Sequence, residues 1–476
     1  MKRYSIIMKR LFFLIVIAAS QLCASAAAPA DSIRARAALT LDDLQVLAIN
    51  NNHDLQRARL DISMAEADAD AAFTNFFPSL QANATGFIGA KDLMRTTMDM
   101  TSFGQTYGPA LMQAGLGELL MGMPPENKVS MMKKGVVADV MAMQPIFAGG
   151  QIVNGNRLAA LQKEVRRLQL KMSTYDVLRS VSDYYWQIIA LRSNLATLDA
   201  VDAQLDSIHT LTENFIDAGM ITRNDLLTVE LKQQETASNR LQLNNGMELL
   251  RLVLAQLCGA DAADFDVVTP STLFSPAPPS DYFVPPTEAV YNRVELELAG
   301  KNVEAKALQV RMERGKALPT VAIGAVGMYQ GIDMGDMSLS RGGNMHNMST
   351  GNLVGLATVS IPISDWWSTK HAVRKARLTQ QQAEIDREEA LEKLQIDIVS
   401  AWNNLNEAYS QIAIARKSIV ASNENLRLSR NQYAAGTLPM SDLMNAITLS
   451  VQAQSSLNAA LATYQQRLFE YVSKTR

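Results

Sequence analysis

The sequence predicts a mainly α-helical protein with a small β part, built from two copies of one structural repeat. Residues 157–218 and 366–435 contain neither glycine nor proline, so each is expected to form one very long helix. Four shorter segments alternate apolar and polar residues, which is typical of β-strands. Short phrases also recur at a constant distance along the chain, which indicates an internal duplication.

The duplication extends over nearly the whole chain. Matching residues lie 241 positions apart in the N-terminal part of each copy and 217 positions apart after the second strand. The pairs include Ala48 with Ala289, Pro78 with Pro319, Pro145 with Pro362, Gly219 with Gly436, and Asp225 with Asp442. We therefore divide the chain into a first repeat at 27–260 and a second at 287–476. Residues 261–286 between them contain six prolines, which is typical of a linker.

The N-terminus is predicted to be a signal peptide, residues 1–26. A basic start is followed by the uncharged apolar run 11–19 and an Ala-x-Ala cleavage site ending at Ala26. Leu22 precedes Cys23 where a lipoprotein signal has a small residue, so we expect cleavage without a lipid. Cys258 is then the only thiol, and no disulfide within the chain is expected. Later apolar stretches are too short for a membrane helix, so membrane entry would require β-strands.

The first helix of the first repeat is expected to start at Thr40. Asp43 follows three residues later as a near capping box, and Pro78 ends the helix after a break near residues 50–53.

The four strands are expected in pairs around two loops. Their residues are 80–87 and 136–144 in the first repeat, and 321–329 and 353–361 in the second. In the last strand Leu353, Ala357, Val359 and Ile361 share one face, and Thr358 and Ser360 share the other. One apolar face suits a half-buried sheet, or a sheet that faces lipid on one side and water on the other.

Each long helix is followed by a short phrase that predicts a turn and a returning helix. Leucine, isoleucine, valine and alanine recur every three or four residues along the helices, which indicates a seam with partner helices. Gly219 and Gly436 can adopt the left-handed conformation that ends a helix. Asn224-Asp225 and Ser441-Asp442 are expected to cap the returning helices. Each phrase is therefore interpreted as the tip of a helical hairpin.

Taken in order, these motifs resemble the TolC-type outer-membrane efflux ducts over residues 40–470. The marks are LTLDDLQVLAINNNHDLQRAR, FFPSLQANATG, MQPIFAGGQ and the paired tips AGMITRNDLL and AGTLPMSDLM. The resemblance implies a homotrimer whose four strands per chain form a twelve-stranded outer-membrane barrel, continued by an α-helical tunnel through the periplasm. It also implies passive export, with a periplasmic adaptor and an inner-membrane pump as partners. Four strands alone are too few to close a barrel, which agrees with three chains.

The resemblance also assigns residues at both ends of the duct. Asp442 matches an acidic ring at the tunnel aperture, whereas Asn445 stands where the family often has a second acid. Tyr433 and Asp225 match positions that latch the hairpins together, and Leu438 stands where a basic latch residue occurs.

Two tryptophans at a strand-to-helix junction depart from the other copy. Trp366 and Trp367 stand where the first copy has Gly149 and Gly150. They are candidates for contact with the membrane interface, and ordinary packing at the junction is the alternative.

Other functions find less support in the sequence. The net charge of −3 becomes −7 without the signal peptide, and no basic stripe suggests nucleic-acid binding. The four histidines are scattered and no catalytic or nucleotide motif occurs, so neither an enzyme nor a cofactor is expected. Methionines gather around the two loops, as an adaptable surface or as soft metal ligands. A non-enzymatic periplasmic coiled-coil adaptor or scaffold is the alternative to the duct.

Overall fold

The computed structural model describes residues 37–91, 94–115, 126–131, 134–261, 265–333, 338–339, 343–344, 347–364 and 366–476. The predicted signal peptide and part of the methionine-rich loops, including Met345 and His346, lie outside these residues.

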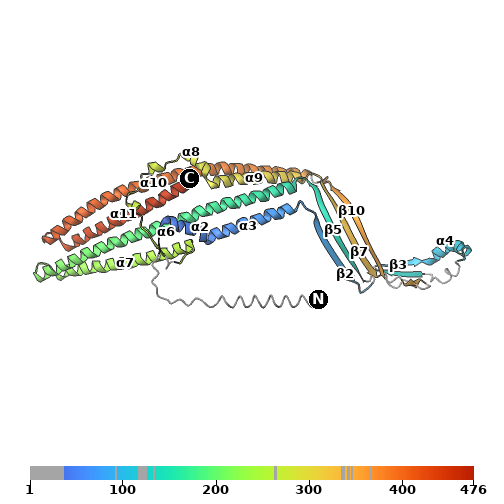
Figure 1. Cartoon of the computed structure of the whole chain (residues 1–476), viewed down its shortest axis with the longest axis horizontal. Helices are drawn as coiled ribbons and strands as arrows, with labels where there is room; N and C mark the ends of the chain where they lie inside the picture. The colour runs from blue at the N-terminus through green and yellow to red at the C-terminus, as the bar shows by residue number, and fades with distance from the viewer. Residues whose placement is uncertain are drawn as a thin grey trace, which may run out of the picture.

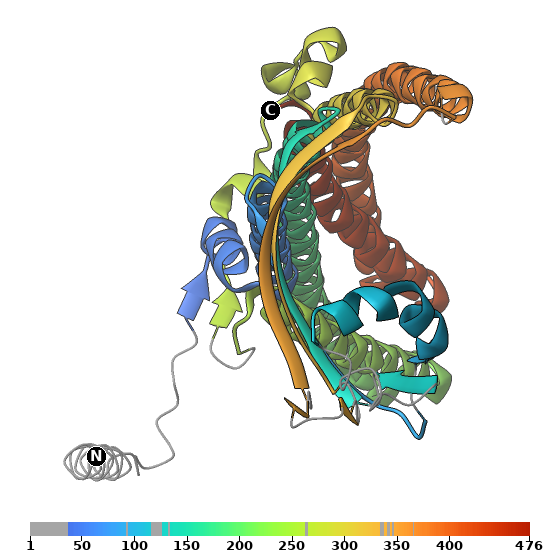
Figure 2. The ribbon, with the colours of Figure 1, turned by 90° about the vertical axis from the view of Figure 1, so that its right-hand side faces the viewer.

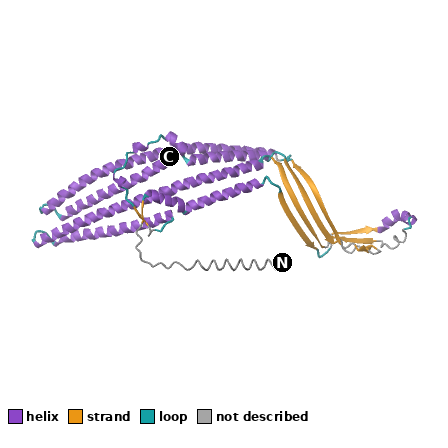
Figure 3. Cartoon of the chain, viewed as in Figure 1, coloured by secondary structure: helices purple, strands orange, loops and turns teal. Residues whose placement is uncertain are grey.

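Two long helical hairpins and one four-stranded sheet make an elongated molecule (Figures 1 and 3). Helix α6 covers Gln151–Asp217 and α10 covers Trp366–Ala434. They return as α7, Arg223–Cys258, and α11, Met440–Thr475. With 67 residues, α6 is about 100 Å long at ~1.5 Å per residue. The two predicted long helices are therefore confirmed, and both hairpin tips lie at the end of the molecule away from the sheet.

Shorter helices complete the half of the helical part that adjoins the sheet. Helix α2 covers Leu41–Asn51, α3 covers His53–Thr74, and α9 covers Val294–Gly315. The expected capping box at Thr40 is formed with Asp43. Asn52 makes the expected break, because its side chain accepts the N–H of Asp54 and of Leu55 and donates to Leu257 O at 2.9 Å.

The sheet contains the four predicted strands, all antiparallel and longer than expected. They are β2, Ser79–Ile88; β5, Lys134–Ala148; β7, Thr320–Asp333; and β10, Asn347–Ser360, in the order β10-β7-β5-β2. Ile361 lies one residue beyond β10, so the predicted last strand was placed too late. Each strand continues into or follows a helix, and α3, α6, α9 and α10 lie side by side in the same order as their strands.

The two faces of the sheet differ in chemistry. One face carries the cross-strand row Ala82–Val140–Gly327–Leu353, and the other carries Asn83–Asp139–Met328–Asn352. The next row of the first face holds Leu80, Ala142 and Ala325, and one neighbouring row of the second face holds Thr85, Gln330 and Thr350. Asn83 Nδ2 donates to Asp139 Oδ2 at 3.0 Å on the polar face. The predicted alternation therefore holds in the rows with Asn83 and Thr85, whereas the row Gln81–Met141–Val326–Val354 makes the second face apolar there as well.

The predicted linker is an ordered layer at the waist of the molecule. Its strand β6, Phe265–Val267, pairs in parallel with β1, Ala37–Leu39, and both lie on the convex side of the curved wall (Figure 2). Short helices follow at Ser271–Phe274, Pro279–Tyr282, Pro286–Ala289 and Val290–Asn292. Tyr464 and Tyr471 extend from α11 to the linker, where Tyr464 donates to Ala277 O and Tyr471 accepts from Val284 N at 3.0 Å.

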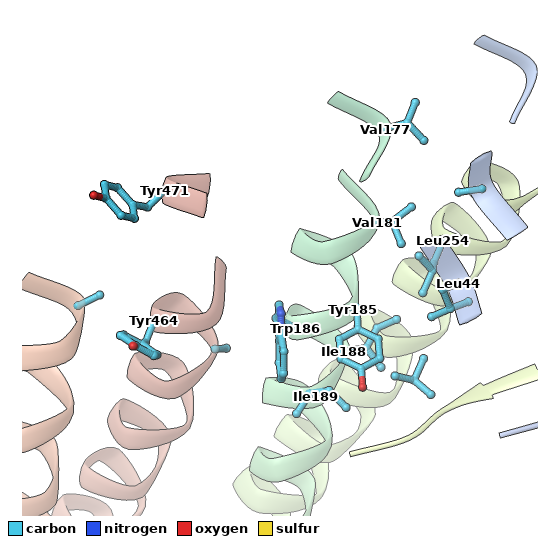
Figure 4. Packing of buried hydrophobic residues seen from close by; sticks show 14 of the residues in the cluster. Leu44, Val177, Val181, Tyr185, Trp186, Ile188, Ile189, Leu254, Tyr464 and Tyr471 are labelled. Atoms are coloured by element: carbon cyan, nitrogen blue, oxygen red, sulfur yellow. The ribbon is translucent and has the colours of Figure 1, made fainter. Parts of the chain in front are cut away.

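The main hydrophobic core lies under this layer. Tyr185, Trp186 and Ile189 of α6 meet Leu44 of α2 and Leu254 of α7 there, all buried (Figure 4). Tyr185 also donates to Val268 O at 2.6 Å, so burial of a large aromatic ring is combined with a satisfied hydroxyl.

The two inter-strand loops contain further short elements. These are β3, Met94–Asp99; α4, Met100–Gln113; β4, Glu126–Met131; β8, Ser338–Leu339; and β9, Gly343–Asn344. Within the described residues, no helix is both long and apolar enough to cross a membrane.

Two backbones meet where the sheet joins the helices. A Cβ on Gly149, whose φ is +59°, would lie 2.1 Å from Gly315 O, and a Cβ on Gly315 would lie 2.2 Å from Gly149 O.

We predict that Gly149→Ala destabilises the protein by roughly 3 kcal/mol or more, because the positive φ strains an alanine and its Cβ would also overlap the backbone of Gly315. Thermal unfolding in detergent measures the effect. Gly155→Ala is the control, since its Cβ would meet nothing within 4 Å. Equal unfolding midpoints for the two variants would contradict the predicted clash.

Candidate functional site at the hairpin tips

Both hairpins turn through the same backbone motif. Gly219 and Gly436 have φ values of 70° and 69°. Met220 N donates to Phe215 O at 2.8 Å and Thr437 N donates to Gln432 O at 2.9 Å, the long bond of a Schellman turn. The predicted left-handed glycines are thus confirmed, and the duplication is exact in backbone geometry at this point.

The capping residues are different from those predicted. Helix α7 has Thr222 as its N-cap and α11 has Pro439, and neither makes a side-chain capping bond. Asp225 and Asp442 are the third residues of their helices, so the assignment of capping to them and to Asn224 and Ser441 was wrong. Thr222 and Pro439 have extended backbones, and the helices begin directly after them at Arg223 and Met440, ahead of the predicted caps. A carboxylate in the first turn still interacts favourably with the helix dipole.

The two tips of one chain are held together by a shared core, which we call the tip cluster. It comprises Val201, Leu205, Ile208, Val229, Tyr433, Met440, Leu443, Met444 and Ile447. Tyr433 is only 4% exposed, and its hydroxyl lies 3.3 Å from Thr212 Oγ1 on the other hairpin. Burial raises the pKa of Tyr433, the hydrogen bond with Thr212 opposes this, and the carboxylate of Asp225 adds to it. The structure thus brings the two predicted latch positions, Tyr433 and Asp225, into one neighbourhood, whereas Leu438 packs against the cluster.

The predicted aperture residues lie outside this cluster. Asp442 and Asn445 are both exposed and are three residues apart on α11, so they share one side of the helix. Their side chains are therefore free to face a common space.

A histidine near the tip was not singled out from the sequence. His209 Nδ1 lies 3.5 Å from Glu213 Oε2, and its Nε2 lies 3.9 Å from Glu230 Oε1 on the returning helix. The four-residue spacing to Glu213 could have been read from the sequence, but the contact with Glu230 depends on the register of the hairpin.

Aromatic residues gather at the opposite end of the helices, next to the sheet. Helix α10 begins at Trp366, and Trp367 is 80% exposed. At the end of α3 the ring of Phe73 packs against Phe76 and Phe77, with centroids 5.6 Å and 5.5 Å apart, and these rings are also exposed. The phenylalanines were missed, although the run FTNFF before Pro78 could have indicated them.

No group of three or more metal-ligating side chains occurs among the described residues. Cys258 is buried, and burial raises its pKa to about 11, so the thiol stays protonated at neutral pH.

A scan against protein families settles the relationship. The family of outer membrane efflux proteins matches residues 44–260 and 286–470, which is most of the chain and both repeats. The chain belongs to the outer membrane efflux protein family.

Relatives of this efflux family agree in sequence and in fold. The outer membrane efflux protein BepC of Brucella suis is 24% identical over 326 residues, which cover 66% of this chain and 66% of BepC. This chain therefore spans slightly less than two thirds of the length of BepC. The outer membrane protein VceC of Vibrio cholerae has a TM-score of 0.68 at 14% identity, covering 91% of this chain and 95% of VceC. A membrane protein of Pseudomonas aeruginosa gives 0.70 at 17% identity, covering 95% and 97%.

Family and fold agree with the resemblance seen in the sequence. The protein is a member of the outer membrane efflux protein family, and its helical part and its sheet part are arranged like those of the structurally similar proteins.

The buried Tyr433 offers a test of the tip cluster. We predict that Tyr433→Phe weakens the tip of this protein by about 1 kcal/mol, the usual value of one buried hydrogen bond. Tyr433→Ala is expected to cost roughly 3–5 kcal/mol, since the buried ring is lost as well. Hydrogen exchange of amides around Thr212 measures both. Tyr175→Phe is the control. Tyr175 lies on α6, the helix of Thr212, and its hydroxyl makes no hydrogen bond within the described residues. Unchanged exchange in Tyr433→Ala would contradict the role of the cluster.

Proposed function

We propose that this protein is the exit duct of a tripartite efflux or type I secretion system. In this proposal it is a homotrimer that conducts substrates passively from an inner-membrane pump and a periplasmic adaptor to the outside. The sheet and the helices that continue its strands form one curved wall. The observation that carries the proposal is that both edges of this wall are unpaired within the described part of the chain.

The sheet cannot satisfy its own backbone at these edges. Within the described residues β2 pairs only with β5, and β10 pairs only with β7. Each outer strand therefore leaves a row of backbone groups open to a further strand. In a bilayer such groups must be paired, and closure into a barrel achieves this. Three copies supply twelve strands, and β2 of one copy would pair with β10 of the next.

Exposed apolar side chains continue the same edges along the helices. On α3 Leu60 and Met64 are 63% and 58% exposed. On α10 Leu378, Ile385 and Ile396 are 53%, 62% and 68% exposed, at spacings of 7 and 11 residues that keep them on one side of the helix. These stripes suit burial against a neighbouring copy.

The faces of the sheet suit a barrel wall in the outer membrane. Lipid would cover the apolar face, and water would fill the space along the polar face with Asn83 and Asp139. Trp366 and Trp367, with the phenylalanines at the end of α3, would lie at the membrane interface. The helices would then extend into the periplasm toward the adaptor and the pump.

A periplasmic adaptor or scaffold is the alternative function. It would use the long hairpins, but it leaves the apolar face of the sheet and the open strand edges without a role. The duct explains both, so we prefer it. The pump would determine whether drugs, metals or proteins are carried.

The trimer can be tested at its apolar edge. We predict that Ile385→Asp combined with Ile396→Asp abolishes the trimer in detergent, because each contact would bury unpaired carboxylates. Light scattering measures the molecular mass. Leu449→Asp is the control, since Leu449 is 53% exposed on α11, which has a neighbouring helix on each side. A stable monomer of the unmodified protein, soluble without detergent, would refute the shared barrel.

The aperture can be tested at Asp442. Three copies of Asp442 would face one another at the tips and favour cations over anions in the passage. We predict that Asp442→Asn lowers cation selectivity about twofold or more and relieves block by multivalent cations, because the ring charge is removed. Single-channel recording in planar bilayers measures both properties. Asp281→Asn in the linker, on the convex side, should leave them unchanged. Identical selectivity in wild type and Asp442→Asn would remove Asp442 from the aperture.

A further inference from the structure

The two edges of the wall carry opposite charges close to the sheet. The first turns of α10 hold Lys370, Arg374, Lys375 and Arg377, with no acidic residue from Trp366 to Ala383. The last turns of α3 hold Asp68 and Asp70, with no basic residue after Arg59. All six side chains are exposed, and none of them forms an ion pair among the described residues.

Several other charges in this region are paired within the chain. Glu66, also on α3, lies 3.0 Å from Lys163 and 3.4 Å from Arg167 of α6. Lys316 at the end of α9 lies 2.7 Å from Glu313. The unpaired charges of α3 and α10 thus stand on the two helices that have a neighbour on one side only.

We propose that these residues form an electrostatic clasp between copies of the chain. Asp70 and Asp68 of one copy pair with the four cations of α10 in the next. This inference rests on the homotrimer proposed above and adds how its edges recognise each other. The partner is a second copy, because its edge offers the opposite charge and continues the pairing of β2 with β10.

The charges lie at matching heights. Strand β2 begins five residues after α3 ends at Thr74, and α10 begins at Trp366 six residues after β10 ends. When β10 meets β2 of the next copy, the two helix ends therefore lie side by side. Asp70 is four residues from the end of α3 and Lys370 is four residues from the start of α10, so each is ~6 Å from its helix end.

The charges also lie on matching flanks of the helices. With about 100° per residue, Arg374 falls within the apolar stripe of α10, Lys370 and Arg377 fall on one flank, and Lys375 falls on the other. On α3 the stripe of Leu60 and Met64 has Asp70 on one flank and Asp68 on the opposite flank. When two antiparallel helices pack with their apolar stripes facing each other, side chains that lie on the same side of each stripe, viewed from each helix's own N-terminus, come next to each other. Asp70 thus adjoins Lys370 and Arg377, and Asp68 adjoins Lys375.

The clasp distinguishes correct from incorrect pairing. Two α10 edges would place cations against cations, and two α3 edges would place carboxylates against carboxylates. Such two-fold pairs are disfavoured, whereas a head-to-tail contact of α10 with α3 brings opposite charges together and continues around a ring. The charges therefore direct the chain toward a closed ring rather than a symmetric dimer.

A charge exchange tests the clasp in the full-length protein. Asp70→Lys, and Lys370→Glu combined with Arg377→Glu, are each expected to accelerate dissociation of the detergent-solubilised trimer about tenfold, the scale of three exposed ion pairs. The variant that carries all three substitutions should recover most of the wild-type rate, because opposite charges again face each other. Arg311→Glu is the control, since Arg311 is equally exposed and unpaired but stands on α9, inside the wall.

Disulfide trapping locates the contact. Asp70→Cys combined with Lys370→Cys should give covalent trimers in outer-membrane fractions, and Asp70→Cys combined with Arg311→Cys should not. A stable trimer that lacks both the cross-link and the charge effect would overturn the clasp and leave the trimer intact. Absence of any wild-type trimer would instead overturn the proposed function. Dissociation that depends on phosphatidylglycerol content but not on residue 70 would assign the cations to lipid and also overturn the clasp.

Discussion

The hydrogen-bonding requirement of a β-strand is the constraint on which this architecture depends. A four-stranded sheet satisfies the inner strands β5 and β7 on both sides, but it leaves β2 and β10 with one open side each. Since each strand leads directly into or out of a helix, the order of the strands fixes the order of the helices below. The open edges of the sheet consequently become open edges of the helical wall, and apolar and charged side chains are distributed accordingly.

Close backbone contact and a wide hydrophobic layer then keep this wall in one shape. Gly149 and Gly315 allow two chain segments to touch at the level where strands become helices. At the waist, aromatic residues of α6 and α11 fill the core and also hydrogen-bond the proline-rich linker through their hydroxyl groups. Sheet and helices are thus fixed relative to each other by the smallest residues at one level and by the largest at another.

Much of the fold could be predicted because its signals are local and repeated. The absence of glycine and proline marks α6 and α10, alternation marks the strands, and Gly219 and Gly436 mark the turns. The three-residue strands β1 and β6 escaped prediction because a periodicity of two needs more residues to be seen. The capping roles of Asp225 and Asp442 were wrong because the start of a helix depends on backbone angles that neighbouring polar residues satisfy equally well. At the tip, Tyr433 and Asp225 were assigned by resemblance, whereas the position of His209 between Glu213 and Glu230 requires the three-dimensional register.

The waist has a mechanical consequence. In the half next to the sheet the wall consists of α3, α6, α9 and α10, and in the half next to the tips it consists of α7, α6, α11 and α10. Two of the four helical columns are therefore single continuous helices, α6 and α10. Each of the other two consists of shorter helices that meet end to end at the waist. Gly259 after α7 contacts Asn51 of α2, and Asn292 before α9 donates to Thr475 O of α11. Continuous and interrupted helices alternate across the wall. Bending at the waist would have to deform α6 and α10, so these two uninterrupted helices stiffen the wall there although the other two columns are interrupted.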